Sequence, residues 1–416
     1  MVRALRGQLG EVSRAIAVAI AVGTFPPGEA RAEDRVFTDE EAAEVDTEDW
    51  LGRVYFVDLD TYRAPPSWDG AWRAAKTGYR VSAGSLNCCL LMVEQAAKLQ
   101  GQVLPYTTFR YRFEHREDRE VKSLHHWLEL LAGGEDGPVA FALGEPHFDK
   151  RRTVLGGGAA FRAGGRELVR AWRAVPFLLY NDPRRNPEAQ DRFTQPPGTW
   201  GVSADLFQQQ ALRATFHVEV DDPTGWTFPD RFYRYQGSRA LLTAEARLGP
   251  ATASVEVERT HRDEAWEVPE RPEETLAQEL FAFRARPEVR VDLGRVEVRG
   301  GLSAWSRAAR TVRGLETDER RREEWIPYTE ARVPLGEALA LETGLYLNVH
   351  QGQRTWVDLE REPEPYAGAE LKVRVALEVR WSRNVWLFIN PTVHIRFDGP
   401  YPDLWGGGNA HLLFAY

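Results

Sequence analysis

The sequence predicts an all-β fold: a transmembrane, up-and-down antiparallel β-barrel of about 16 strands, with roughly 14 to 18 possible, behind an N-terminal periplasmic extension. Three observations favour it. They are an export signal, a long series of segments in which apolar and polar residues alternate, and connections that alternate between short and long. The predicted parts are a secretory signal peptide at residues 1–32, an acidic extension or plug at 33–102, and the barrel at 103–416.

The N-terminus has the order of a signal peptide. The basic start MVRALRGQLGEVSR is followed by the apolar AIAVAIAVGTF and by PPGEARA, which closes with Ala-x-Ala. We therefore expect cleavage after Ala32 and export. The alternative, a buried N-terminal helix, is less favoured because Ala15 to Phe25 is too short to span a bilayer and two prolines follow it.

Composition excludes two classes of protein. A mean hydropathy of -0.46 and a charged fraction of 28% leave no room for a bundle of hydrophobic helices. The net charge is -9, and removing the signal peptide makes the chain more acidic, so we expect no nucleic-acid partner.

Residues 33–102 divide into two stretches. Residues 33–49 carry nine acidic residues and one basic residue, which predicts a solvated segment. Residues 50–102 mix turn signals with short apolar runs that fit either a strand or a buried helix. Within them Cys88 and Cys89 are adjacent; a disulfide between neighbours is strained, so we interpret them as two small apolar side chains.

From residue 104 onward, apolar residues recur at every second position. In AELKVRVALEVRW (369–381) the apolar and charged residues fall on opposite faces of a strand. A short turn at Ser382 to Asn384 leads into a second alternating segment, which predicts a hairpin. Short turns near Gly133, Gly164, Gly249 and other positions alternate with longer polar connections, of which 181–199 and 310–324 are examples. This alternation is typical of an up-and-down meander.

The apolar face can point inward or toward lipid. In a secreted soluble β protein the apolar face would form the core and the charged face would be exposed to solvent. The export signal, the alternating connections and the lack of a second covering layer favour the membrane barrel, whose sheet must close on itself.

The C-terminal residues carry the resemblance to a known family. The chain ends in NAHLLFAY, with apolar residues at every second position before a final aromatic residue. This ending resembles that of Gram-negative outer-membrane β-barrel proteins of the porin-like kind. The resemblance implies that Leu412, Phe414 and Tyr416, with Ala410, form the signal for the barrel-assembly machinery, and that the last strand closes the barrel against the first. It also implies outer-membrane localisation and contact with outer-membrane lipid.

The inward face of such a barrel is expected to line a polar lumen, because a barrel of this size is too wide for its side chains to fill. The alternative is that these charges form cross-strand ion pairs that only stiffen the wall. The predicted pore-lining residues are Arg110, Arg112, Glu114, Arg213, His217, Glu219, Arg239, Glu245, Arg247, Glu256, Glu258, Lys372, Arg374, Glu378, Arg380, His394 and Arg396.

The sequence shows no recognisable catalytic constellation, metal set or cofactor motif. His125 and His126 are adjacent, and on a strand their side chains point to opposite faces, so they are not expected to bind one metal. We predict no enzyme activity and a porin-like channel for hydrophilic solutes. The alternative is the barrel component of an export or surface-assembly system that uses the extension as a plug or docking arm. A homo-oligomer or a periplasmic partner is compatible with either.

Overall fold

The strands close into a barrel. The computed structural model describes residues 63, 66–85, 91–117, 122–145, 153–164, 166–176, 192–195, 198–209, 211–314, 316–357, 361–397 and 403–416. The strands of these residues form one 20-stranded sheet, in which β1 pairs with β2 on one side and with β20 on the other. Eighteen of them make the antiparallel wall, while β8 and β11 form a short pair beside β12.

The elements have the following bounds. The helix is α4 (Pro66–Ala74), and a short 3-10 helix, η3, spans Pro272–Glu274. The strands are β1 (Thr77–Ser85), β2 (Leu91–Leu104), β3 (Thr107–Glu117), β4 (Lys122–Ala132), β5 (Gly137–Glu145), β6 (Val154–Ala163), β7 (Arg166–Pro176), β8 (Arg192–Gln195), β9 (Thr199–Gln209), β10 (Leu212–Asp221), β11 (Thr224–Thr227), β12 (Phe232–Leu248), β13 (Ala251–Glu267), β14 (Leu276–Asp292), β15 (Glu297–Arg313), β16 (Glu316–Pro334), β17 (Leu339–Trp356), β18 (Glu364–Ser382), β19 (Val385–Arg396) and β20 (Asp403–Ala415).

The all-β barrel is confirmed, and its 18 strands fall within the predicted range. The predicted boundary at residue 103 is wrong, because β1 and β2 already belong to the wall. Small residues interrupt the alternation of these two strands on both faces, among them Ser82 and Ala83 on β1 and Ala96 and Ala97 on β2. Gly84 illustrates the reason: a Cβ there would lie 2.3 Å from the carbonyl oxygen of Gly408 on β20.

The C-terminal strand closes the barrel against the first strand, as predicted, although that first strand is β1 and not a strand near residue 104. Tyr79 lies opposite Phe414 in this seam. The carbonyl oxygen of Tyr416 accepts hydrogen bonds from the backbone N–H groups of Lys76 and Thr77, at 2.8 and 2.9 Å. The last residue is thereby tied to the residues just before the first strand.

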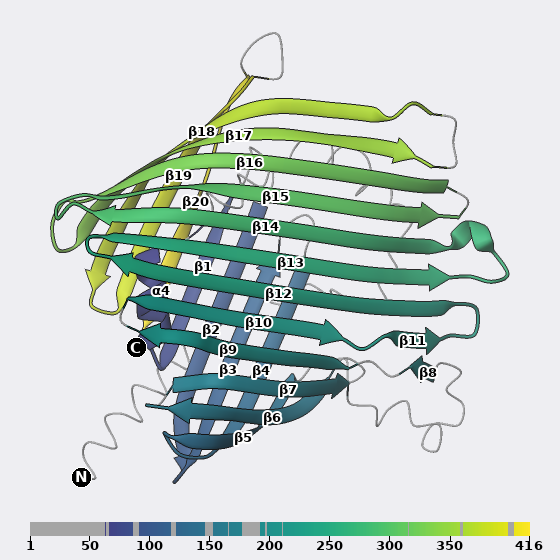
Figure 1. The fold of residues 1–416 in the computed structure, drawn as a ribbon, viewed down its shortest axis with the longest axis horizontal. Helices are drawn as coiled ribbons and strands as arrows, with labels where there is room; N and C mark the ends of the chain where they lie inside the picture. Colours follow the sequence, from purple (N-terminus) through teal and green to yellow (C-terminus); the bar gives the residue numbers. More distant parts are fainter. Residues whose placement is uncertain are drawn as a thin grey trace.

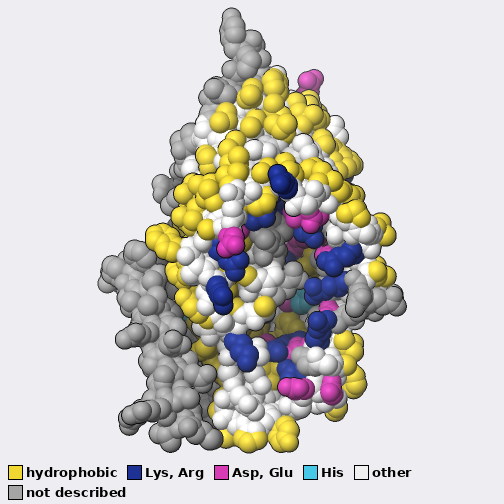
Figure 2. Space-filling view, turned by 90° about the vertical axis from the view of Figure 1, so that its left-hand side faces the viewer, with side chains coloured by type: hydrophobic (Ala, Val, Ile, Leu, Met, Phe, Trp, Pro, Cys, Tyr) yellow, Lys and Arg dark blue, Asp and Glu magenta, His cyan; other side chains and the backbone are white. Residues whose placement is uncertain are grey.

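The two faces of the wall differ in polarity. On β16 and β17 buried and exposed residues alternate over most of each strand, and charged residues occupy many of the buried positions. On β20, Asn409, His411 and Leu413 are buried, whereas Leu412 and Phe414 point to the outer face. Figure 2 shows one end of the barrel, where charged side chains line a hollow inside a hydrophobic rim.

The wall is taller on one side. Strands β12 to β18 have 17 to 19 residues, whereas β1 has 9. Figure 1 shows β12 to β18 stacked across the view, with the shorter strands β1 to β4 crossing behind them. The long connection expected at 310–324 is wrong, because β15 runs to Arg313 and β16 begins at Glu316.

The outer face of the tall side changes character along its strands. Glu323 on β16 accepts a hydrogen bond from Gln351 on β17 at 3.0 Å on the exposed outer surface. The next outward residue of β16 is Trp325, 49% exposed. The outward residues that follow it, Pro327, Thr329, Ala331 and Val333, are uncharged. The band from residue 325 to 333 matches the roughly 9 to 11 residues with which a tilted strand crosses a bilayer.

Helix α4 lies inside the barrel, at the end where the short turns and the C-terminus lie (Figure 1). Pro66 occupies its first position, where a helix loses no hydrogen bond. Trp68 and Trp72, four residues apart, share one face. No helix within the described residues is long and apolar enough to cross a bilayer.

Candidate functional site

The structure places the predicted pore-lining residues of β18 and β19 on the inner face. Lys372 and Arg374 are each 2% exposed, Glu378 is 5% exposed and His394 is fully buried. His394 shares a 2.5 Å hydrogen bond with Glu370, one strand away. Alternation in the sequence therefore indicated the correct face, although these side chains are packed together and are not open to a wide pore.

The predicted residues of β3, β10, β12 and β13 occupy the corresponding alternate positions and are more exposed. Arg239 forms a 2.7 Å ion pair with Glu258, and His217 lies 3.0 Å from Glu219. The others in this group are Arg110, Arg112, Glu114, Arg213, Glu245, Arg247 and Glu256. Whether they line a conducting pathway stays a prediction.

The last two predicted residues lie near strand ends. Arg380 is exposed and stacks on Trp386, with its guanidinium carbon 5.5 Å from the ring centre. The side chain of Arg396 lies outside the described residues, as do the expected signal peptide and the Cys88–Cys89 pair.

A cluster of six charges, five of them buried, forms on the inner wall at the short-turn end. We call it the wall network; its members are Arg299, Glu330, Arg332, Glu342, Arg374 and Glu378. Arg374 contacts Glu342 at 2.8 Å and Glu330 at 3.4 Å. Arg299 pairs with Glu330 as well and lies 3.7 Å from Glu342. Three guanidinium and three carboxylate groups thus neutralise one another, five of them largely away from water, and such pairing is what buried charges require.

The wall network is connected to helix α4. Arg332 contacts Glu378 at 2.7 Å and Glu342 at 3.5 Å. The other carboxylate oxygen of Glu378 accepts a 3.2 Å hydrogen bond from the indole N–H of Trp68. Trp68 is 4% exposed, and its ring packs edge-on against Phe388. Trp68 therefore holds the helix to the wall by one charge-assisted hydrogen bond and by apolar contacts.

The two flanks of α4 reach other parts of the wall. Arg63, just before the helix, lies 3.8 Å from Glu256 on β13. At the other end, the ring of Trp72 lies about 5 Å from the cationic groups of Arg80 on β1 and Lys98 on β2. A segment that touches β13, β18 and β1 crosses the lumen. It therefore narrows the passage at the short-turn end.

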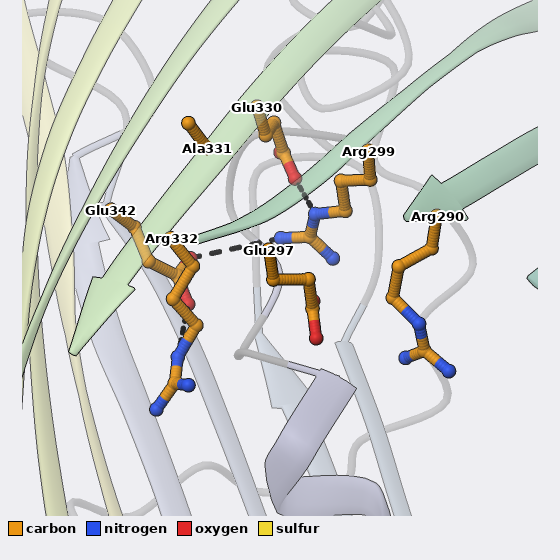
Figure 3. A pocket seen from close by; sticks show the side chains of 7 residues that line it. All are labelled: Arg290, Glu297, Arg299, Glu330, Ala331, Arg332 and Glu342. Atoms are coloured by element: carbon orange, nitrogen blue, oxygen red, sulfur yellow. Dashed lines mark ion pairs between the residues drawn. The ribbon is translucent and has the colours of Figure 1, made fainter. Parts of the chain in front are cut away.

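A cavity of about 60 Å³ lies beside the wall network. Figure 3 shows its lining, in which side chains from three neighbouring strands and the first residues of β17 converge. The lining residues are Arg290, Glu297, Arg299, Glu330, Ala331, Arg332 and Glu342. It combines cationic and anionic groups in a partly enclosed space.

The opposite inner wall carries an apolar cluster beside a group of ion pairs, in which Glu129 and Glu167 contact Arg110 and Arg170. Leu131, Val139 and Phe141 of β4 and β5 are buried in one cluster, and Trp127 packs edge-on against Trp172 of β7. Apolar residues on the inner face explain why alternation in 121–131 and 153–163 is imperfect. The lumen is thus lined by charged residues on both sides, with an apolar cluster on this one.

The two adjacent histidines point to opposite faces, as predicted. His125 lies 2.7 Å from Glu145 on β5. His126 instead bonds with the hydroxyl of Tyr111 at 2.9 Å.

Sequence reasoning missed Glu330, Glu342 and Arg299 as inner-wall residues. The signal was present, because Tyr328, Glu330 and Arg332 follow one another at every second position of a predicted strand. Trp68 carried no comparable signal, since its role depends on a helix folding back into the barrel.

Comparisons with known proteins add a resemblance in architecture. No protein-family model and no curated protein matches the chain. Among solved structures, CdiB from Acinetobacter baumannii is 8% identical, with a TM-score of 0.41 over 82% of this chain and 60% of CdiB. OmpT of Vibrio cholerae is 6% identical, with a TM-score of 0.36 over 82% of this chain and 96% of OmpT. The translocator domain of the autotransporter NalP from Neisseria meningitidis is 11% identical, with a TM-score of 0.33 over 87% of this chain and 96% of that domain.

The geometry of the chain itself defines its class. The sheet closes through β1 and β20, the outer face carries an apolar band, and the inner face carries charged residues. Backbone groups in lipid must all be paired, which a closed sheet achieves. The protein is a closed transmembrane β-barrel, the architecture of outer-membrane β-barrel proteins.

Proposed function

We propose that the protein is an outer-membrane channel for hydrophilic solutes whose lumen is narrowed at the short-turn end by helix α4. The observation that supports it most is the position of α4 inside a charged lumen, joined to the wall through Trp68 and Glu378. A charged inner surface suits water and polar solutes. The sheet closes without α4, so a helix held only by side-chain contacts can leave that surface without unfolding the wall.

The same proposal places the barrel in the outer membrane of a Gram-negative bacterium, with the short-turn end on the periplasmic side. The expected export signal supports this placement, together with the outward positions of Leu412 and Phe414 on the terminal strand and the exposed Tyr416 directly after it. We expect delivery by the barrel-assembly machinery. A homo-oligomer or a periplasmic partner remains part of the proposal.

A second candidate is the barrel component of an export or surface-assembly system. The helix inside the lumen favours it, because an exported chain needs a wide pore that is closed at rest. The two candidates differ in the resting state. A solute channel conducts small ions with α4 in place, whereas an export pore is sealed until α4 leaves.

The test is conductance in planar bilayers. We expect a small conductance from the unaltered protein and a several-fold larger one from the double variant Trp68→Ala and Trp72→Ala, because both aromatic anchors of the helix are lost. Trp381→Ala is the matched control, since Trp381 lies on the outer face and is 79% exposed; its conductance should equal that of the unaltered protein.

Three outcomes separate the candidates. A sealed unaltered protein with a conducting double variant favours the export component. Equal conductance of the unaltered protein and the double variant contradicts the role of α4. No conductance from any correctly folded form contradicts the channel itself.

A further inference from the structure

The cavity beside the wall network contains two charges that the network does not neutralise. Of its three arginines, Arg299 and Arg332 are engaged by Glu330, Glu342 and Glu378. Within the described part of the chain, Arg290 has no ion-pair partner, and neither has Glu297. Both are half-buried and line the same cavity.

The strand register holds these two residues in place. Arg290 on β14 lies opposite Arg299 on β15, and Asp292 lies opposite Glu297. Like charges directly opposite each other are unfavourable in a sheet. The positive charge of Arg299 is neutralised by the carboxylates of the wall network. The positive charge of Arg290, beside Arg299, is not neutralised in this way. The next strand provides no partner for Glu297 either: Arg332 lies opposite it, but contacts Glu342 and Glu378.

The side chains of Arg290 and Glu297 are not in contact with each other. Figure 3 shows both extending to the same side of the cavity, while dashed lines join Arg299 and Arg332 to the network carboxylates. A guanidinium and a carboxylate that face one space without meeting present a separated pair of opposite charges. Such a pair is complementary to a solute that carries both charges itself.

The charge balance of the lining selects among solute classes. Three arginines and three glutamates give no net charge, so the cavity as a whole favours neither a simple anion nor a simple cation. Its volume of about 60 Å³ corresponds to about two water molecules, which limits the enclosed part of a ligand to a few heavy atoms.

We propose that this cavity binds a small zwitterion of the α-amino-acid class, with the carboxylate on Arg290 and the ammonium group on Glu297. This assignment names a solute class for the proposed channel, and to that extent the assignment rests on the proposed function. Binding itself does not require that the barrel conducts.

The probe is glycine, titrated calorimetrically into the full-length protein in detergent. Acetate and methylammonium each carry one of the two charges and serve as comparison probes. Glycine should bind at least about tenfold more tightly than either, because only glycine satisfies both groups. Arg290→Gln and Glu297→Gln should each weaken glycine binding about tenfold or more.

Arg247→Gln and Glu245→Gln are matched controls. Both residues are exposed on β12 toward the same end of the barrel, and neither lines the cavity. They should leave glycine binding unchanged.

Acetate binding as tight as glycine binding would show a plain anion site and overturn the proposal. Absence of glycine binding, or equal binding by all four variants, would overturn it too. Because conductance is measured separately, loss of binding with conductance retained rejects only the zwitterion site. Binding without conductance rejects only the channel.

Discussion

The indole N–H of Trp68 donates a hydrogen bond to a carboxylate oxygen of Glu378 across 3.2 Å, although the two residues are 310 positions apart in the sequence. This bond joins helix α4, which precedes the first strand of the wall, to β18, the third strand from the C-terminal end. It links the lumen helix to the wall network, because the other oxygen of Glu378 is held by Arg332.

Two substitutions of Trp68 separate the hydrogen bond from the packing. Trp68→Phe keeps an aromatic ring against Phe388 but removes the donor, so we expect a loss of about 1 to 3 kcal/mol in the free energy of unfolding. Trp68→Ala also removes the ring and should cost about 3 to 5 kcal/mol. Equilibrium unfolding by denaturant in detergent measures both. Equal losses for the two variants would mean that the bond to Glu378 accounts for the whole effect and the packing of the ring for none, whereas no loss in Trp68→Phe would mean that packing alone holds the helix.

The pair Arg374 and Glu342 is suited to a double-mutant cycle. Each is 2% exposed, so removing one partner leaves a buried charge, and we expect Arg374→Met or Glu342→Gln to destabilise the barrel by about 3 to 5 kcal/mol. The double variant should recover a substantial part of the loss. Strict additivity of the two single losses would contradict direct coupling.

The seam between β1 and β20 depends on a glycine. Gly84→Val should prevent closure, because the new Cβ would lie 2.3 to 2.5 Å from backbone and side-chain atoms of Gly408 and Asn409. Gly101→Ala is the control, since nothing lies within 4 Å of a Cβ there. The difference in electrophoretic mobility between boiled and unboiled samples reports the folded fraction. A fully folded Gly84→Val variant would contradict the seam as described.

The apolar band on the outer face makes a prediction about lipid. Leu345 on β17 points outward and is 49% exposed, so Leu345→Arg should destabilise the barrel in a bilayer by about 2 to 4 kcal/mol. Gln353 shares that face but lies beyond the Gln351–Glu323 hydrogen bond, and Gln353→Arg should have an effect near zero. Folding titrations in lipid vesicles compare the two. Equal effects would place the membrane boundary elsewhere.

The barrel could be predicted from sequence because its wall obeys a local rule. On β18 and β20 each residue's face follows from whether its number is odd or even, and long runs of this kind leave few alternatives. The rule fails where both faces carry small or apolar residues. That is why β1 and β2 were assigned to the extension, and why 153–163 alternates poorly around its glycines.

The candidate site was harder to predict because it depends on contacts distant in sequence. The inward position of Arg374 follows from alternation, but its pairing with Glu342 depends on the register between two strands. The position of Trp68 depends on the chain turning back into a space that exists only after closure. No local pattern carries that information.

The connection between α4 and the wall is very short. Only Ala75 and Lys76 separate the helix from β1, and the N–H of Lys76 is bonded to Tyr416 at the seam. If the helix leaves the lumen, this short connection keeps it near its binding site on the wall, and its effective concentration there is on the order of millimolar. Its contacts with the wall can therefore re-form rapidly, so the displaced state is transient unless a ligand or another molecule captures the helix outside.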